Sequence, residues 1–289
     1  MEFQFYKLVS GMSDLILINM MDEVAPSDGL LASLSVRMCK RRSGIGAQGV
    51  VFLLPGESHQ ISLRYFLSNG RESLLCAEPV LFASRYLFDA GIIGKEGFLV
   101  ETKTGEKHIR PIDSSNFAVS LGIPMDTEGT RLTGTASSSF EEYSLVHYAE
   151  SQGKVPMTLI DMGFNGAVFF SEEPLLGMKQ HAMKLSQTLG IRDADVWHPI
   201  GAFPYKSDEI QVKGFDRTAI AQPVTSAAIG AVASMIQGFS DRSCLAFVRG
   251  SSYFVRWDEA TSVVDVCGSA DYVFTGEYFF DAEELEPED

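Results

Sequence analysis

The sequence predicts an α+β protein built from two similar halves. Three observations lead to this fold class. Short runs rich in Val, Ile, Phe and Tyr, bounded by Gly, Asn, Ser or Asp, recur along the chain and are typical of strands. Stretches with the helical spacing of apolar residues are fewer. A strand–turn–helix unit occurs twice, about half the chain apart.

The expected strands lie in both halves, and irregular segments separate them. The piece at 124–152 reads as a loop-rich crossing, Trp197-His198-Pro199 as a loop, and 281–289 as a solvated acidic tail. The strand pattern covers residues 15–19, 49–54, 61–67, 98–102, 157–162, 166–170, 245–249, 253–257, 262–266 and 272–280.

The helical pattern is found in four stretches, at 30–42, 77–91, 177–190 and 225–238. The last three end in Gly, which can adopt the left-handed conformation that commonly closes a helix. The stretch at 225–238 is small and apolar nearly all round, so it should be buried.

The repeated unit predicts two similar domains. Phe66 lies ten residues before Cys76, and Phe215 lies ten residues before Thr225. Each pair runs from an expected strand, at 61–67 or at 211–215, to the start of an expected helix, and the two units are 149 residues apart. We expect each domain to point the amino end of one helix toward a shared cleft.

Composition excludes several classes of protein. The formal net charge is −15 with no basic cluster, which argues against a nucleic-acid partner. Four scattered cysteines without a C-x-x-C pair, and five scattered histidines, argue against a zinc site and a disulfide framework. No run of 18 apolar residues is present and the first residues lack the pattern of a signal peptide, so we expect a cytoplasmic protein without a membrane partner.

Two facing helix starts would support proton transfer at a carbon atom. A helix amino terminus gathers unpaired N–H groups and positive dipole, so it lowers the pKa of a thiol and attracts a carboxylate. Groups on the two ends could then reach opposite faces of the α-carbon of a small amino or hydroxy acid. No cofactor is needed if the cleft closes and excludes water.

Several motifs resemble the diaminopimelate epimerase family from about residue 5 to residue 280. They are "FYKLVSGMSDLILIN", "CKRRSGIGAQGVVFLL", "YFLSNGRESLLCAEPVLFASRYLFDAG", "VETKTGE", "DMGFNGAVFF" and "GSADYVFTGEYFF", in this order. The resemblance implies two pseudo-symmetric domains, each a barrel-like, mostly antiparallel sheet around a central helix, with the active site in the cleft between them. We expect an N-terminal domain over 1–122, joined by 274–289, and a C-terminal domain over 123–273.

The resemblance also implies cofactor-independent epimerisation by two cysteines, as used in making lysine and cell-wall precursors. Its acid–base positions correspond to Cys76 and Thr225, and a homodimer is compatible with it. The expected substrate contacts are Ser13, Asn69, Ala77, Asn165, Asp216, Arg217 and Ser226.

This chain departs from the family where the chemistry should occur. The family's Cys-Gly-Asn-Gly run is Cys76-Ala77-Glu78-Pro79 here, in which Pro79 has no N–H and Glu78 repels a carboxylate. Thr225 replaces the second cysteine, and its hydroxyl ionises too reluctantly to serve as a base. The family's Asn-Pro-His becomes Phe164-Asn165-Gly166.

Individual residues have alternative interpretations. Cys76 is either a catalytic thiol or a small buried residue. Thr225 is expected to cap its helix, and Arg217 either holds a carboxylate or pairs with Asp216. The remaining cysteines are expected to pack in the core. They are Cys39, Cys244 and Cys267.

Three functions follow from these departures. The first is an isomerase acting at the α-carbon of an amino acid, with turnover of diaminopimelate itself in doubt. The second is a paralogue with a degenerate active site that serves as a binding or structural protein. The third is elimination or isomerisation of a small carboxylic acid by one base, with Thr225 as a hydrogen-bond donor.

Overall fold

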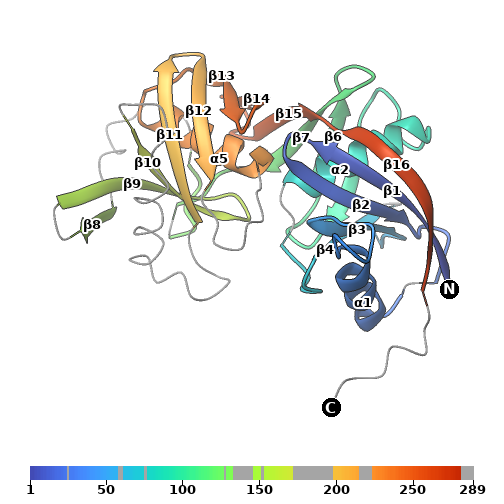
Figure 1. Cartoon of the computed structure of the whole chain (residues 1–289). Helices are drawn as coiled ribbons and strands as arrows, with labels where there is room; N and C mark the ends of the chain where they lie inside the picture. The colour runs from blue at the N-terminus through green and yellow to red at the C-terminus, as the bar shows by residue number, and fades with distance from the viewer. Residues whose placement is uncertain are drawn as a thin grey trace. The chain divides into compact units, whose positions relative to one another are not determined.

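The protein divides into two compact units, residues 1–119 with 269–289 and residues 120–268 (Figure 1). In the computed structural model, no helix of the described residues is long and apolar enough to cross a membrane. The structure describes residues 1–24, 26–57, 61–74, 77–126, 128–132, 146–150, 153–171, 198–214 and 223–280.

The first unit is one sheet with two helices. Its strand order is β16-β1-β2-β3-β4-β5-β6-β7, and neighbours are antiparallel except for β2–β3 and β4–β5, which are parallel. The elements are β1 (Glu2–Ser10), β2 (Ser13–Asn19), α1 (Asp28–Met38), β3 (Gly49–Leu54), β4 (Ser62–Leu67), α2 (Ala77–Asp89), β5 (Phe98–Thr102), β6 (Lys107–Pro111), β7 (Asn116–Gly122) and β16 (Asp271–Phe279).

The second unit repeats this arrangement. Its strand order is β8-β9-β10-β11-β12-β13-β14-β15, with parallel pairs at β10–β11 and β12–β13, and its described helix follows β12 as α2 follows β4. The elements are β8 (Val146–Glu150), β9 (Gly153–Asp161), β10 (Asn165–Phe170), β11 (His198–Lys206), β12 (Glu209–Gly214), α5 (Pro223–Ile236), β13 (Ser243–Val248), β14 (Ser251–Trp257) and β15 (Val264–Ser269).

Helix α1 covers an apolar layer of the first unit. Its start is capped by Ser27, whose Oγ accepts a hydrogen bond from the Leu30 amide. Leu31, Leu34 and Met38 are fully buried from solvent in a cluster with side chains of β1, β2 and β3. This packing orients the helix on its sheet.

Helix α2 buries one broad face. Its buried side chains include Val80, Leu81, Phe82 and Leu87, whereas Arg85 is partly exposed and pairs with Asp89. The helix contacts β1, β2, β3 and β6. The helix therefore leaves one narrow polar stripe accessible to solvent.

Helix α5 is buried on every side through residues 223–234, as its sequence predicts. It contacts each strand from β9 to β14. A methyl group at Gly230 would lie 2.8 Å from Cγ2 of Val212 in β12, so the glycine allows helix and strand to approach closely. Small side chains therefore let this helix pass through the centre of its unit.

The fold class and the ten expected strands are confirmed, with boundaries shifted by a few residues. The helix expected at 30–42 ends early, at Met38, because the chain folds back and the amide of Gly46 donates to the Met38 carbonyl. The loop expected at 197–199 is wrong, since β11 begins at His198. Strands β1, β7 and β11 were not expected, and β8 lies inside the stretch expected to be loop-rich. The helix expected at 177–190 and the acidic tail lie outside the described residues.

Candidate functional site

One end of the first unit's sheet collects polar residues from three strands. The amide of Gln48 donates to the Asp14 carbonyl at 2.9 Å, and the amide of Ser68 donates to the Gln48 carbonyl at 3.0 Å. Ser13 begins β2 beside Asp14 and is 1% exposed, and Asn69 follows Ser68. The sequence-predicted residues Ser13 and Asn69 therefore lie at the same end of the sheet.

Asn69 has a structural task at this end. Its Oδ1 accepts a hydrogen bond from the Arg71 amide at 3.0 Å, within a turn that Gly70 completes with a φ of 80°. A side chain in the turn position explains the Asn-Gly pair without a ligand. A substrate contact at Asn69 stays a prediction.

The Asp14 carboxylate is held by two cations. It accepts a hydrogen bond from Lys7 Nζ at 2.7 Å and two from the Arg41 guanidinium at 2.8 and 2.9 Å. Burial disfavours its charge, but the bonds from Arg41 and Lys7 outweigh burial and hold the pKa of Asp14 below its ordinary value. Burial likewise lowers the pKa of Lys7, against the effect of Asp14. This group therefore fastens the β1–β2 hairpin to the loop after α1.

The segment that leads to Cys76 is fixed to β4. After Gly70 it runs back along the strand, where Glu72 bridges to Phe66 and the Ser73 amide donates to the Tyr65 carbonyl at 2.9 Å. The chain is thus held three to four residues before the cysteine.

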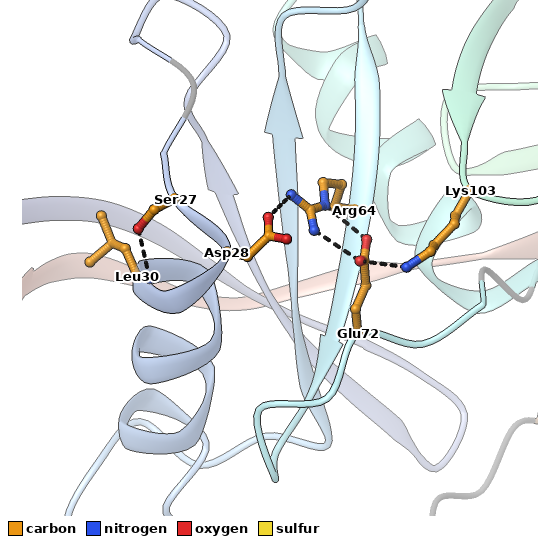
Figure 2. A network of polar contacts seen from close by, with 6 residues as sticks. All are labelled: Ser27, Asp28, Leu30, Arg64, Glu72 and Lys103. Carbon is orange, nitrogen blue, oxygen red and sulfur yellow. Dashed lines mark hydrogen bonds and ion pairs between the residues drawn. The ribbon is translucent and has the colours of Figure 1, made fainter. Parts of the chain in front are cut away.

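Side chains reinforce this segment (Figure 2). Arg64 in β4 donates to both carboxylate oxygens of Glu72 at 2.8 Å, and its third nitrogen donates to Asp28 at the start of α1. Lys103, just after β5, reaches Glu72 from the other side at 2.8 Å. The Arg64 hydrogen bonds outweigh partial burial and lower the pKa of Glu72. The bidentate pair restricts both position and orientation of the segment.

The first turn of α2 is closed to solvent. Ala77 is 2% exposed and Glu78 is 4% exposed. Glu78 places a carboxyl group where a helix favours negative charge. Cys76, the predicted catalytic thiol, precedes this turn and lies outside the described residues, as do Asp216 and Arg217.

The first turn of α5 is also closed. Thr225 is 4% exposed and Ser226 is 5% exposed. A methyl group at Gly214, the last residue of β12, would lie 2.6 Å from Ser226 Oγ, so Ser226 rests directly on the strand end. The predicted cap at Thr225 is wrong, because α5 begins at Pro223 and Thr225 is its third residue. Pro223 is the signal for this earlier start, because proline is favoured at the first position of a helix.

The start of β10 carries an aromatic stack that the sequence did not indicate. Phe164 stacks on His198 with ring centroids 4.1 Å apart and an interplanar angle of 15°. Asn165 begins β10 beside them and is half-buried, and Gly166 lies against Ile229 of α5. The parallel pairing of Gly166 with His198 brings the two rings together across the strands.

Two of the remaining cysteines are core residues, as expected. Cys39 is 4% exposed and Cys244 is 1% exposed, and burial raises the pKa of their thiols to about 12 and about 11. Cys267 is half-buried. Among the described residues, no group of His, Cys, Asp and Glu side chains is arranged to hold a metal ion.

The chain is similar in sequence to an epimerase and similar in fold to an epimerase and an isomerase. No family model matches the chain. It is 27% identical to the diaminopimelate epimerase of Desulfovibrio desulfuricans, over 96% of this chain and 98% of the relative. Its fold matches a hydroxyproline epimerase from Agrobacterium vitis with bound trans-4-hydroxy-L-proline (TM-score 0.65, 14% identity, 96% of this chain and 92% of that one). It also matches a methylitaconate-delta-isomerase (TM-score 0.62, 8% identity, 99% of this chain and 97% of that one).

Proposed function

We propose, because this chain belongs to the diaminopimelate epimerase family, that it is an isomerase that moves a proton at the α-carbon of a small amino acid or carboxylic acid without a cofactor. The membership rests on a match over nearly the whole length of both chains. The substrate is a separate question, because an identity of 27% does not extend to every residue that contacts it.

The observation that carries the proposal is the repeated strand–helix unit. In the first unit, α2 connects the parallel strands β4 and β5. In the second unit, α5 connects the parallel strands β12 and β13 in the same way. Free amides at such a start attract a carboxylate. In the proposed reaction the start of α2 attracts the substrate carboxylate, and Cys76 removes and returns the α-proton.

The groups around the first helix start favour a substrate other than diaminopimelate. Glu78 brings a carboxyl group into the first turn of α2, and Pro79 has no N–H to donate. Both changes weaken the hold on a carboxylate at this point. Arg217 is the remaining cation assigned to a substrate carboxylate by the resemblance, and this role stays a prediction.

Exchange of the α-proton with solvent tests the proposal. The protein is incubated with LL-diaminopimelate, L-proline and trans-4-hydroxy-L-proline in deuterated water, and deuterium at the α-carbon is followed by NMR. We expect exchange into at least one acid, reduced by about 100-fold or more in Cys76→Ser because the acid–base group is removed. Cys267→Ser is the matched control and should keep the wild-type rate. Equal rates in Cys76→Ser and wild type would contradict the role of the thiol.

A double-bond shift in a small unsaturated acid is the second candidate. It is favoured by the similarity to a methylitaconate-delta-isomerase and needs only one acid–base group. Methylitaconate and related acids, followed by ultraviolet absorbance, test it with the same two cysteine variants. If no acid reacts and Cys76 alkylates no faster than free cysteine at pH 7, the catalytic proposal fails and a binding or structural role takes its place.

A further inference from the structure

Three tyrosine rings lie against one another in the first unit, and they come from three different elements. Tyr6 of β1 is in the middle. Its ring centroid is 4.7 Å from that of Tyr86 in α2 and 6.1 Å from that of Tyr272 in β16. The interplanar angles are 52° and 58°, so the rings are tilted against each other. We call these three residues the tyrosine cluster.

A β-bulge brings Tyr272 to the face of Tyr6. The register between β1 and β16 shifts before Leu8, which pairs with Tyr272 and leaves Val273 as an extra residue of β16. Tyr6 and Leu8 share one face of β1, because side chains alternate along a strand. Without the shift, Leu8 would pair with Val273, and Tyr272 would point to the opposite face. The cluster therefore depends on the pairing of these two strands.

The phenols of the cluster have polar neighbours. Asn19 Nδ2 donates a hydrogen bond to Tyr86 Oη at 3.0 Å. Arg85 lies over the Tyr272 ring, 5.4 Å from its centroid, and pairs with Asp89 at 2.6 Å. Burial raises the pKa of Tyr86 and of Tyr272, and the Asp89 carboxylate raises the pKa of Tyr272 further. Both phenols are therefore protonated at neutral pH, and removal of an electron has to be accompanied by removal of a proton.

Solvent reaches the cluster at its edge. Tyr86 is 8% exposed, whereas Tyr6 and Tyr272 are half-buried. A small oxidant can take an electron from the accessible rings, but the Tyr86 ring is shielded from a second protein molecule. A radical formed in the cluster therefore finds its phenol partner within the same chain.

Tyr205 of the second unit offers a comparison. It is 43% exposed, and its printed ring neighbours are Phe203 and Phe247. An oxidant reaches this ring more easily than the cluster, but the rings beside it are not phenols. Exposure and the proximity of a second phenol are thus separated in one molecule.

We propose that Tyr6 and Tyr86 form an oxidative modification site, at which a one-electron oxidant of the haem-peroxidase class joins the two rings as dityrosine. Each phenol gives one electron to the oxidant and one proton to solvent, which leaves two phenoxyl radicals. The radicals form a bond between the ring carbons next to the C–O carbons. The hydrogens on these two carbons leave as protons, and the two oxygens take up protons to become phenols again. In total, two electrons and two protons are removed, and they reduce one hydrogen peroxide to two water molecules. This inference does not depend on the proposed function.

The new bond closes a long loop. Positions 6 and 86 differ by 80 residues, and β2, α1, β3 and β4 lie between them. A covalent link over such a span restricts the unfolded chain, as a disulfide does. A carbon–carbon bond, unlike a disulfide, is not broken by a thiol reductant. Oxidation therefore fixes α2 to β1, and we expect it to raise the Tm of the protein.

Peroxidase treatment of the full chain tests the proposal. Wild type, Tyr6→Phe, Tyr86→Phe and the matched control Tyr205→Phe are incubated in dilute solution with a haem peroxidase and hydrogen peroxide. Dityrosine is followed by its fluorescence and mapped by mass spectrometry of peptides, and circular dichroism verifies folding. We expect a link between Tyr6 and Tyr86 that lacks two hydrogens, in protein that keeps the monomer mobility in a denaturing gel. Tyr6→Phe and Tyr86→Phe should abolish this product, whereas Tyr205→Phe should keep it.

Other results would overturn the inference. A main link from Tyr6 to Tyr272 would show that the shorter ring distance does not select the partner. Dityrosine found only between chains and lost in Tyr205→Phe would show that exposure decides the product. Consumption of peroxide without dityrosine would show that the rings do not meet in a reactive orientation. Wild type oxidised in concentrated urea provides a measurement that needs no variant: an equal yield of the link between Tyr6 and Tyr86 there would show that the folded contact does not direct it.

Discussion

The units β4–α2 and β12–α5 share a length and a helix ending, but they differ in what surrounds the helix. Helix α2 keeps a partly exposed stripe, whereas α5 is buried on all sides through residue 234. The segment before α2 is clamped by the Arg64–Glu72 pair. Strands β4 and β12 begin 147 residues apart, at Ser62 and Glu209. By this spacing the positions of Arg64 and Glu72 correspond to Gln211 and Ala219, which cannot form an ion pair. The two units therefore share the order of strand and helix. At these two positions, the first unit has an ion pair before its helix and the second unit does not.

Changing Gly230 to alanine tests the tighter packing of α5 and has the largest expected effect on stability. Its counterpart in α2 is Ala83, so α2 accepts a methyl group where α5 leaves none. The new methyl would lie 2.8 Å from Val212, and such overpacking costs about 1–3 kcal/mol, more than the helix gains from alanine. We expect the free energy of unfolding in urea to fall by about 2 kcal/mol.

The control for that substitution is Gly29→Ala in α1. A methyl group there meets nothing within 4 Å, so the gain in helix propensity should raise stability by about 0.5–1 kcal/mol. If both variants shift stability in the same direction, close approach of α5 to β12 is not what distinguishes the two helices.

Changing Glu72 to glutamine tests the clamp before α2. We expect a loss of about 1.5 kcal/mol at pH 7 and faster hydrogen exchange at the amides of Glu72 and Ser73, because Arg64 loses a bidentate acceptor. Gln211→Ala, at the counterpart of Arg64, is the matched control and should leave exchange in the first unit unchanged. Unaltered exchange in the Glu72 variant would argue against a clamp.

The pH dependence of this loss has a defined sign. The folded-state pKa of Glu72 is depressed, so its contribution is fully present above the unfolded-state pKa of about 4.3 and is lost as pH falls through the folded-state pKa. The stability difference between wild type and Glu72→Gln should therefore shrink below about pH 4. A difference that grows in acid would mean that Glu72 is not stabilised as a carboxylate.

The smallest effects are expected from Gly91→Ala and Gly238→Ala. Both glycines have a φ near 70°, where a Cβ costs about 1 kcal/mol. Because neither Cβ would meet another atom within 4 Å, the two losses in thermal stability should be equal within error. Clearly unequal losses would weaken the equivalence of the two helix ends.

Much of the fold could be predicted from the sequence because strand and helix patterns depend on local composition. Residues 49–54 form β3 as expected, because a short unbroken apolar run next to Gly and Pro is typical of a buried strand. Strand β11 was missed because Trp197-His198-Pro199 resembles a loop, whereas Pro199 is accommodated where β11 pairs with β10. The segment is a strand because it pairs with β10 and β12, and its own residue types do not indicate this pairing.

The candidate site was harder to predict. The helical pattern at 225–238 predicts a buried helix, and this is confirmed, but α5 begins two residues earlier, at Pro223. The substrate contact expected at Ser226 stays a prediction. The contact between Phe164 and His198 depends on parallel pairing across 34 residues and was equally hidden.

The charge on Asp14 is already neutralised inside the protein. Lys7 and Arg41 both donate to its carboxylate, so a ligand ammonium arriving there would have to displace a cation that is tethered to the chain. Replacing an intramolecular partner by a dissolved one gives up the advantage of high local concentration. The Asp14 carboxylate is therefore a poor acceptor for the ammonium group of a dissolved ligand.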